Sequence, residues 1–528
     1  MDMINQSSAL GNEIVYHSNS KMEMIYLFSS EKGLQEVQED NEINSKMEMI
    51  NLFSNEKGLQ EFSFSSCSNQ NNLASTFRKT VYMDMMNQKG LQKCVKRYHG
   101  DNLISRLPDD ILLAILSFLP LKEVGRTSVL SSRWKNLWSY ISHLNFDDYS
   151  SMEKIMRASE FHTVSVEREK YVKWVDSVLQ SHRGSTVKEL RICFSLVKSA
   201  TNSITKWLEF AFERHTEKLE LNLSEGDLIH AQDKTYVFPQ ELCSSDGPYK
   251  SSRLFNCKSI KMLSLGCIQV SGETIEFFLR GCPLLEQLNV RASKYLTRLE
   301  VCGPSLVLKH LEIWDCTYLK SLRISAPKLS SLRLDKIEGL LLEDVPMLAS
   351  VYVTYADSLI PSIYVERLIS TLLCRLSQLE ILTFDIYCRK ELLLMLKFPL
   401  MPKLKKLVII EGLRGVDSSL LGLANFITAS PNLQEFELKQ RWHKVERSNN
   451  EIQKELKHSP LHQHLNVFRF LGYYGCPSDV ELVNYLLENC VALKEIIVDT
   501  QTQLRLAYDP LDSEQLELAE IAKGHAKQ

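Results

Sequence analysis

The sequence lacks three features that would assign it to a familiar class. It has no excess of positive charge, because 62 Lys and Arg residues stand against 65 Asp and Glu residues, giving a net charge of −3. Binding dominated by nucleic-acid phosphates needs such an excess, so we expect no nucleic-acid partner. The longest strongly apolar run, Ile111 to Leu116, is far shorter than the roughly 18 residues of a membrane span. Residues 1–6 also lack a secretory signal pattern, so we expect neither membrane insertion nor secretion.

Paired metal-binding or disulfide-forming cysteines are missing as well. The 13 cysteines are scattered from Cys67 to Cys490, and no two have C-x-x-C spacing. Scattered thiols suit a reducing intracellular compartment, so we expect neither disulfides nor structural zinc, and a location in the nucleus, the cytoplasm or both. The histidines His458, His462 and His464 have a spacing compatible with metal ligands, but Pro460 disfavours the required helix. We therefore expect no metal and no cofactor.

The usual short motifs of enzymes are absent too. The sequence contains no G-x-x-x-x-G-K-[ST], G-x-G-x-x-G, G-x-S-x-G or H-E-x-x-H. These patterns build phosphate-binding loops, nucleophile turns and zinc-protease helices, so none of those activities has support. We expect a chain without catalytic activity. The enzyme alternative would require a cluster of acid and base groups in a deep pocket.

The first hundred residues contain an internal duplication. Residues 21–36 (KMEMIYLFSSEKGLQE) recur as residues 46–61 (KMEMINLFSNEKGLQE) with two differences. A stacked repeat array needs at least three units to bury a continuous core. We interpret residues 1–100 as a mostly disordered arm. A short partner-binding motif presented twice is the alternative.

Three short helices are predicted after Asp101. Pro108 suits the first turn of a helix that ends before Pro120, a second helix covers residues 122–129, and Ser131 or Ser132 can cap a third. Apolar residues follow helical spacing on the first and third helices. A unit of about 45 residues cannot cover so many large apolar groups by itself. The apolar surface left over predicts a partner-binding face.

The run from Leu107 to Trp138 (LPDDILLAILSFLP … TSVLSSRWKNLW) resembles an F-box, in the form common among plant F-box proteins. Gly125 departs from the pattern, because Ala or Val is expected inside the second helix. The resemblance implies that residues 101–147 bind the Skp-type adaptor and, through it, a cullin scaffold. The adaptor contacts that it implies, position by position, are Leu107, Pro108, Ile111, Ile115, Leu119, Val129 and Trp134.

Beyond residue 180 the sequence repeats the pattern L-x-x-L-x-L. Seven strict matches occur where chance gives about two. Five are consecutive (LEQLNV, LTRLEV, LKHLEI, LKSLRI, LSSLRL), so alternate units recur about every 22 residues, which is the period of a leucine-rich repeat. Residues 180–455 are thus predicted to form a solenoid, in which the five consecutive motifs make a coil with a strand on each of two faces and the later copies are separated by helical or looped inserts. The pattern resembles the irregular repeats of plant F-box proteins, although only Cys316 occupies the repeat's Asn/Cys position. Looser copies begin at Leu348, Leu379, Leu404, Leu465 and Leu493.

The segment from His458 to Thr500 resembles the FBD domain at the C-terminus of plant F-box/leucine-rich-repeat proteins. Its pattern predicts a strand at residues 465–470, a helix and a strand at residues 493–498, with Ser478 and Glu481 as a capping box. We expect residues 456–528 to cap the open end of the solenoid. A dedicated binding role is the alternative.

The predicted fold class is an α+β or α/β repeat protein. A disordered N-terminal arm precedes a small three-helix F-box, an irregular leucine-rich-repeat solenoid and a C-terminal FBD β-α-β cap. The resemblance implies a substrate-recognition subunit of an SCF-type (Skp-cullin-F-box) E3 ubiquitin ligase. A non-degradative structural or decoy F-box protein is the alternative.

The protein target is unknown, but its binding surface is predicted. In a solenoid the polar positions of the strands point outward. Taking one position from each consecutive strand gives a row of residues whose charge changes sign, which favours a partner of complementary charge. Ordinary solvated residues are the alternative. The residues of this row are Asn289, Glu300, Glu312, Arg323 and Arg333.

Overall fold

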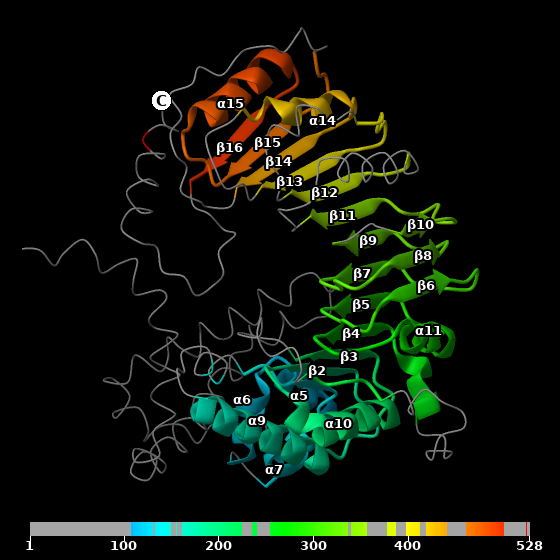
Figure 1. Cartoon of the computed structure of the whole chain (residues 1–528). Helices are drawn as coiled ribbons and strands as arrows, with labels where there is room; N and C mark the ends of the chain where they lie inside the picture. The colour runs from blue at the N-terminus through cyan, green and yellow to red at the C-terminus, as the bar shows by residue number, and fades with distance from the viewer. Residues whose placement is uncertain are drawn as a thin grey trace, which may run out of the picture. The chain divides into compact units, whose positions relative to one another are not determined.

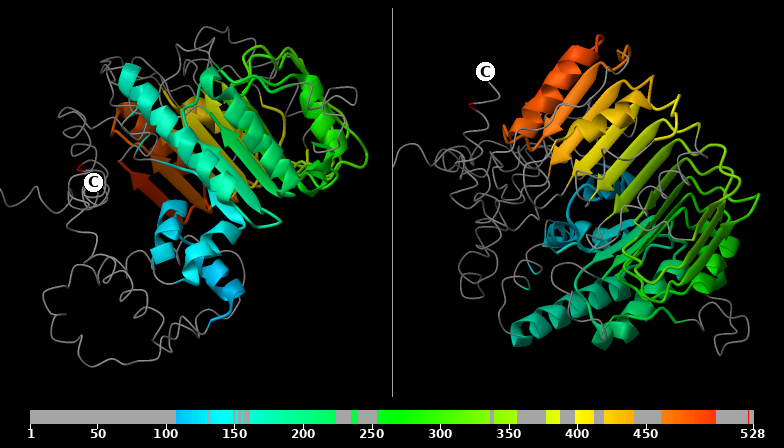
Figure 2. Two further views of the ribbon diagram at one scale, coloured as in Figure 1. Left: turned by 90° about the horizontal axis from the view of Figure 1, so that it is seen from below. Right: turned by 45° about the horizontal axis from the view of Figure 1, so that its top comes forward.

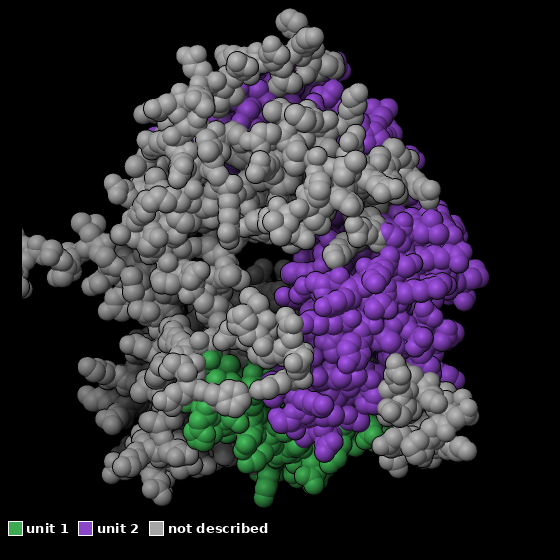
Figure 3. Space-filling view, in the orientation of Figure 1, with its two compact units in different colours: residues 1–195, 206–216, 225–227 green, residues 196–205, 217–224, 228–528 purple. Residues whose placement is uncertain are grey.

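The chain forms two compact units in a computed structural model (Figure 3). Unit 1 comprises residues 1–195, 206–216 and 225–227, and unit 2 comprises the remainder. The duplicated segment and His458 lie outside the described residues. In the part of the chain that is described, no helix is long and apolar enough to cross a bilayer. The structure describes residues 107–129, 132–148, 151, 155, 161–223, 235–239, 254–335, 339–355, 377–386, 398–411, 419–440, 461–500 and 524.

Unit 1 begins with short helices. Helix α5 (Asp109–Leu116) is followed by α6 (Leu121–Arg126), which continues as a single 3-10 turn, η3 (Thr127–Val129). Pro108 and Pro120 each precede a helix in extended conformation, and their carbonyl oxygens accept the first helical N–H groups. Pro108 is therefore the N-cap of α5, one residue before the predicted position.

The third helical segment differs from its prediction at its start. Helix α7 (Trp134–Leu137) is followed by the 3-10 turn η4 (Trp138–Tyr140). The residue at its N-cap is Arg133, not a serine, and no side chain caps the helix. Instead, the Arg133 guanidinium donates to the carbonyl of Leu107 and, from Nε, to the carboxylate of Asp109 at 2.8 Å. This arginine ties the start of α5 to the start of α7.

The rest of unit 1 is built around a long helix, α9 (Phe161–Ser181), and a parallel strand pair, β1 (His143–Asn145) and β2 (Glu189–Cys193). The buried ring of Tyr171 stacks on Phe194 with ring centroids 3.8 Å apart, and its hydroxyl donates to the carbonyl of Phe146 at 2.9 Å. These contacts fix α9 against both strands. Helix α10 (Thr201–Glu213) follows, and its residues from Lys206 onward belong to unit 1.

Unit 2 contains a long parallel sheet, whose strands stack one after another in Figure 1. The strand order is β3-β4-β5-β7-β9-β11-β12-β13-β14-β15-β16. A second parallel sheet of three strands, β10-β8-β6, lies beside β5, β7 and β9 (Figures 1 and 2). The strands are β3 (Lys218–Asn222), β4 (Met262–Gly266), β5 (Gln287–Arg291), β6 (Arg298–Cys302), β7 (His310–Trp314), β8 (Ser321–Ser325), β9 (Ser331–Leu334), β10 (Leu340–Leu342), β11 (Ser350–Tyr355), β12 (Ile381–Ile386), β13 (Lys406–Glu411), β14 (Glu435–Gln440), β15 (Val467–Leu471) and β16 (Glu495–Asp499).

The leucines of the repeat pattern set the register of this unit. Leu288 pairs with Leu311, and Leu311 pairs with Leu332, so the same positions of successive coils lie side by side and are buried. The consecutive motifs of the sequence alternate between the two sheets, because β5, β7 and β9 pair together while β6 pairs with β8. The predicted coil with a strand on each of two faces is confirmed for the consecutive motifs, where β6, β8 and β10 form the second sheet. Each fully buried leucine contributes roughly 1.5–3 kcal/mol to folding.

We call the long sheet the main sheet. Helices cover the side of it that carries the buried leucines at several coils. Helix α11 (Gly272–Gly281) buries Ile275 and Phe278, and its N-cap Ser271 accepts from the N–H of Thr274 at 3.3 Å. Helix α14 (Ala424–Thr428) packs Phe426 against Phe384 of β12, with ring centroids 6.0 Å apart. The opposite face of the sheet carries the alternate, more exposed residues, and we call it the open face.

The C-terminal coil is β15, helix α15 (Pro477–Asn489) and β16, in the predicted order. The predicted capping box of Ser478 and Glu481 is wrong. The helix starts earlier, because Pro477 fits its first turn, and the box is formed by Cys476 and Asp479. The buried Asp479 carboxylate accepts from the N–H groups of Tyr474 at 3.0 Å and Cys476 at 3.2 Å. Glu481 instead accepts from the Ser419 hydroxyl at 2.7 Å.

Candidate protein-interaction surfaces

The first helices of unit 1 leave an apolar stripe uncovered. Pro108, Ile111, Ile115, Phe118 and Leu119 follow helical spacing along α5 and its final turn, which places them on one side. Pro108 is exposed, Ile111 and Phe118 are 39% and 37% exposed, and the other two are half-buried. We call these five residues the apolar stripe. A surface that presents such large side chains to water is typical of a partner-binding site.

Three predicted adaptor contacts are not among these five residues. Trp134 is only 4% exposed, so its indole fills the core between the short helices. Val129 lies in η3, and its side chain is outside the described residues. Leu107 is half-buried directly before Pro108. Phe118 belongs to the stripe but was not among the contacts predicted from sequence, although its seven-residue separation from Ile111 was a usable signal.

The five residues predicted to bind a target do not form one row. Asn289, Glu312 and Arg333 are in register on β5, β7 and β9 of the main sheet. Glu300 and Arg323 are in register with each other on β6 and β8, in the second sheet. The interpretation as a single row is therefore wrong, because consecutive motifs belong to different sheets.

Most charges in that set are already neutralised within the chain. Arg333 forms an ion pair with Glu312 at 3.2 Å, and Arg323 forms one with Glu343 at 2.9 Å. Glu300 accepts from Arg298, and this hydrogen bond and charge lower the pKa of the Glu300 carboxyl. The alternation of sign thus reflects ion pairs within the chain, across neighbouring strands for Glu312 and Arg333 and along one strand for Arg298 and Glu300. It gives no support for a partner with complementary alternating charges.

The open face of the main sheet contains a cluster that the sequence did not reveal. Arg291, Trp314, Arg333 and Tyr352, on β5, β7, β9 and β11, form alternating cation–π contacts. The guanidinium carbon of Arg291 lies 4.3 Å from the Trp314 ring centroid, and that of Arg333 lies 4.7 Å from Trp314 and 4.2 Å from Tyr352. We call these four residues the cation–π ladder. Only strand pairing brings them together, since they are dispersed along the chain.

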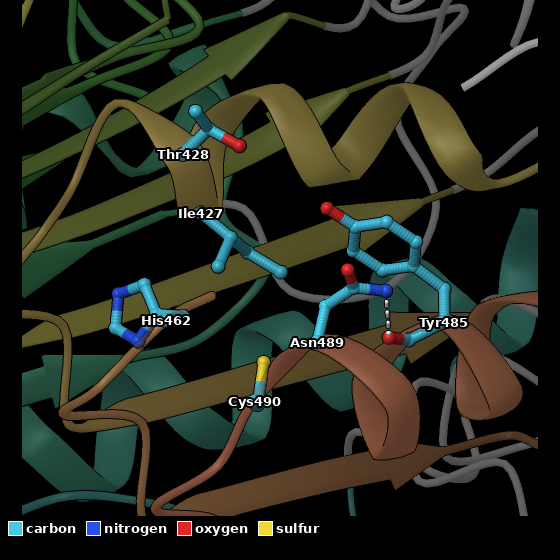
Figure 4. Close-up of a pocket in the computed structure, with 6 residues that line it drawn as sticks. All are labelled: Ile427, Thr428, His462, Tyr485, Asn489 and Cys490. Carbon is cyan, nitrogen blue, oxygen red and sulfur yellow. Dashed lines mark hydrogen bonds between the residues drawn. The ribbon is translucent and has the colours of Figure 1, made fainter. Parts of the chain in front are cut away.

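The buried His462 is part of the C-terminal scaffold. Figure 4 shows it on one side of a small pocket between α14 and α15, near Ile427 and Cys490, with Tyr485 on the opposite side. Its Nε2 lies 2.9 Å from the Ser430 carbonyl, and its Nδ1 accepts from the N–H of Leu465 at 3.1 Å. Both ring nitrogens are thus occupied by backbone groups, which is the arrangement of a neutral structural histidine. Across the described ranges, no three His, Cys, Asp or Glu residues come together as metal ligands.

Folding stability should decrease in mild acid because of this histidine. Burial lowers the pKa of His462 below its usual value of about 6.5, so the unfolded chain takes up the proton first. The free energy of unfolding should be highest above about pH 6.5 and fall as the pH drops below it. In urea unfolding followed by circular dichroism, His462→Gln should weaken this pH dependence, whereas substitution of the exposed His310 should not. An unchanged pH dependence in His462→Gln would contradict this assignment.

Comparisons with known proteins agree with this architecture. A family described as "At1g61320/AtMIF1, LRR domain" matches residues 178–516, and the F-box domain matches residues 104–145. The FBD-associated F-box protein At3g52670 of Arabidopsis thaliana is 27% identical over 445 residues, covering 80% of this chain and 92% of the relative. The Arabidopsis thaliana F-box/FBD/LRR-repeat protein At4g26340 is 26% identical over 413 residues, covering 74% and 91%.

These matches cover both the apolar stripe and the repeat strands. The chain is therefore an F-box protein with a leucine-rich-repeat domain, and the repeat match alone spans more than half of it. It belongs to the plant F-box/FBD/leucine-rich-repeat protein family. Neither matched domain is that of an enzyme.

Proposed function

We propose that this protein is the substrate-recognition subunit of an SCF-type E3 ubiquitin ligase. The observation that carries the proposal is the exposed apolar stripe, which lies inside the F-box match. A Skp-type adaptor covers the stripe and links the chain to a cullin scaffold. The repeat domain supplies the second interaction surface, which binds a target protein.

The mechanism under this proposal is positional. The chain holds the target while a separate ubiquitin-conjugating enzyme is held by the same assembly, so target lysines meet the charged enzyme at high effective concentration. No bond is made or broken by this chain, and no cofactor is needed. The protein acts within the cell, in the nucleus, the cytoplasm or both.

We also propose finer roles for the two ends of the described chain. The helices α5, α6 and α7 act as a three-helix F-box, with Trp134 as its internal support. The β15-α15-β16 coil acts as an FBD cap, because Asp479 anchors α15 to Gln440 of β14, 3.3 Å from its carboxylate. A cap of this kind protects the last strands of a stacked array from solvent.

Reconstitution with a Skp-type adaptor, a cullin and a ubiquitin-conjugating enzyme tests the proposal. Proteins that co-purify with the full chain should be ubiquitinated, and ubiquitination should stop in the variant Ile111→Glu, in which the exposed apolar stripe is changed, while the same proteins still co-purify. Adaptor binding without any ubiquitination of bound proteins would instead support the structural or decoy role. Failure to bind the adaptor would reject both.

A further inference from the structure

The two arginines of the cation–π ladder have different surroundings. Arg333 lies between two aromatic rings and forms an ion pair with Glu312, so its charge is satisfied inside the chain. Arg291 is exposed and stacks on Trp314, but it forms no ion pair with any residue in the described ranges. The ladder therefore ends in one guanidinium group whose charge is not neutralised.

The neighbouring coil leaves this arginine accessible. Gly266 of β4 is in register with Arg291 and has no side chain, and the side chain of Asn222 of β3 occupies the space over Gly266. The next position of β4 on the same face is occupied by Ser264, which is in register with Asn289. The surface beside Arg291 on this side is therefore formed by uncharged residues: Gly266, Ser264 and the amide side chain of Asn222.

The opposite end of the ladder is closed. The Tyr352 hydroxyl donates to the buried carboxylate of Asp385 at 3.2 Å. Burial, and then the charge of Asp385, raise the pKa of Tyr352, so its hydroxyl stays protonated and remains a donor. An internal carboxylate thus completes the ladder at Tyr352, whereas no carboxylate of the described chain completes it at Arg291.

We propose that Arg291 binds an aspartate or glutamate side chain in an acidic segment of the target protein. Stacking on Trp314 occupies one face of the guanidinium and leaves its in-plane N–H fork free for a bidentate carboxylate. The stacking also holds the side chain in place, which reduces the entropy lost on binding. Arginine, tryptophan and tyrosine are the residues that dominate binding energy at protein interfaces. This inference rests on the proposed function and specifies the chemistry of its target.

Selection from a displayed library of random peptides, with the full chain as bait, tests the proposal. Enriched peptides should share an acidic residue, and a synthetic copy should bind about tenfold more weakly when that residue is replaced by its amide. Arg291→Gln should cause a similar loss. The two losses should not add, because each removes the same ion pair.

Two further variants separate the ladder from general charge effects. Arg280→Gln removes an exposed arginine of α11 that pairs only weakly, at 3.8 Å, with Glu276, and it should leave peptide binding unchanged. Trp314→Leu should weaken binding although Arg291 is present, because the stacking support is lost. Enrichment without an acidic residue, no enrichment, or full binding by Arg291→Gln would each overturn the proposal. The affinity for the adaptor is measured separately and tests the proposed function. None of these variants should change it, because none lies in the apolar stripe.

Discussion

Replacing Ile111 with glutamate should abolish tight binding of the Skp-type adaptor. Ile111 belongs to the apolar stripe and is 39% exposed, so the substitution places a charge where the adaptor would exclude water. A hot-spot change of this kind should raise the dissociation constant by about 100-fold or more. The helix itself tolerates the change, because glutamate has good helix propensity and favours the first turn of α5. Isothermal titration with purified adaptor measures the effect.

The matched control is Asn136→Glu. Asn136 is an exposed residue of α7 outside the apolar stripe, and its substitution adds the same single charge to the same group of helices. Asn136→Glu should bind the adaptor with nearly normal affinity, and circular dichroism should show both variants folded. If Ile111→Glu and the unmodified chain bind the adaptor with equal affinity, the apolar stripe is not part of the adaptor interface.

The repeat architecture was predictable because burial alone enforces its pattern. Each L-x-x-L-x-L motif places its apolar residues on the inner side of a strand, as Leu285, Leu288 and Val290 show for β5. Consecutive motifs are separated by about half of one repeat, and this spacing also correctly predicts strands on two faces. These features depend only on local spacing, which the sequence displays directly.

Properties that depend on pairing between distant segments were not predictable in the same way. Glu300 and Arg323 seemed to extend the surface of Glu312, but they belong to the second sheet because β6 pairs with β8. The contact of Trp314 with Arg333 likewise requires the register of β7 with β9. Helical spacing places Trp134 on the apolar side of its helix, but it does not tell whether that side faces the core or the solvent. The spacing of apolar residues identifies the two faces of a helix or strand. Tertiary packing determines which residues each face contacts.

Gly272→Ala should strongly destabilise the folded chain where α11 packs against β6. A β-carbon at Gly272 would lie 2.0 Å from the carbonyl oxygen of Arg298, at the start of β6. Because that neighbour is backbone, it cannot rotate away, and α11 must move off β6. The shift would disturb the hydrogen bond from the Glu300 N–H to Glu276, now 3.3 Å. We expect a loss of about 3 kcal/mol, the upper range for overpacking.

Hydrogen exchange measured by mass spectrometry resolves this effect locally, and Gly125→Ala provides its control. Gly125 lies inside α6, and a β-carbon there meets nothing within 4 Å. The same added methyl group should therefore stabilise α6 by up to about 1 kcal/mol, through helix propensity alone. Gly272→Ala should speed exchange in α11 and β6, whereas Gly125→Ala should slow it in α6. An unchanged hydrogen-exchange rate in α11 of Gly272→Ala would mean that this helix does not pack against β6. If it does pack there, the methyl group fits only when the helix moves.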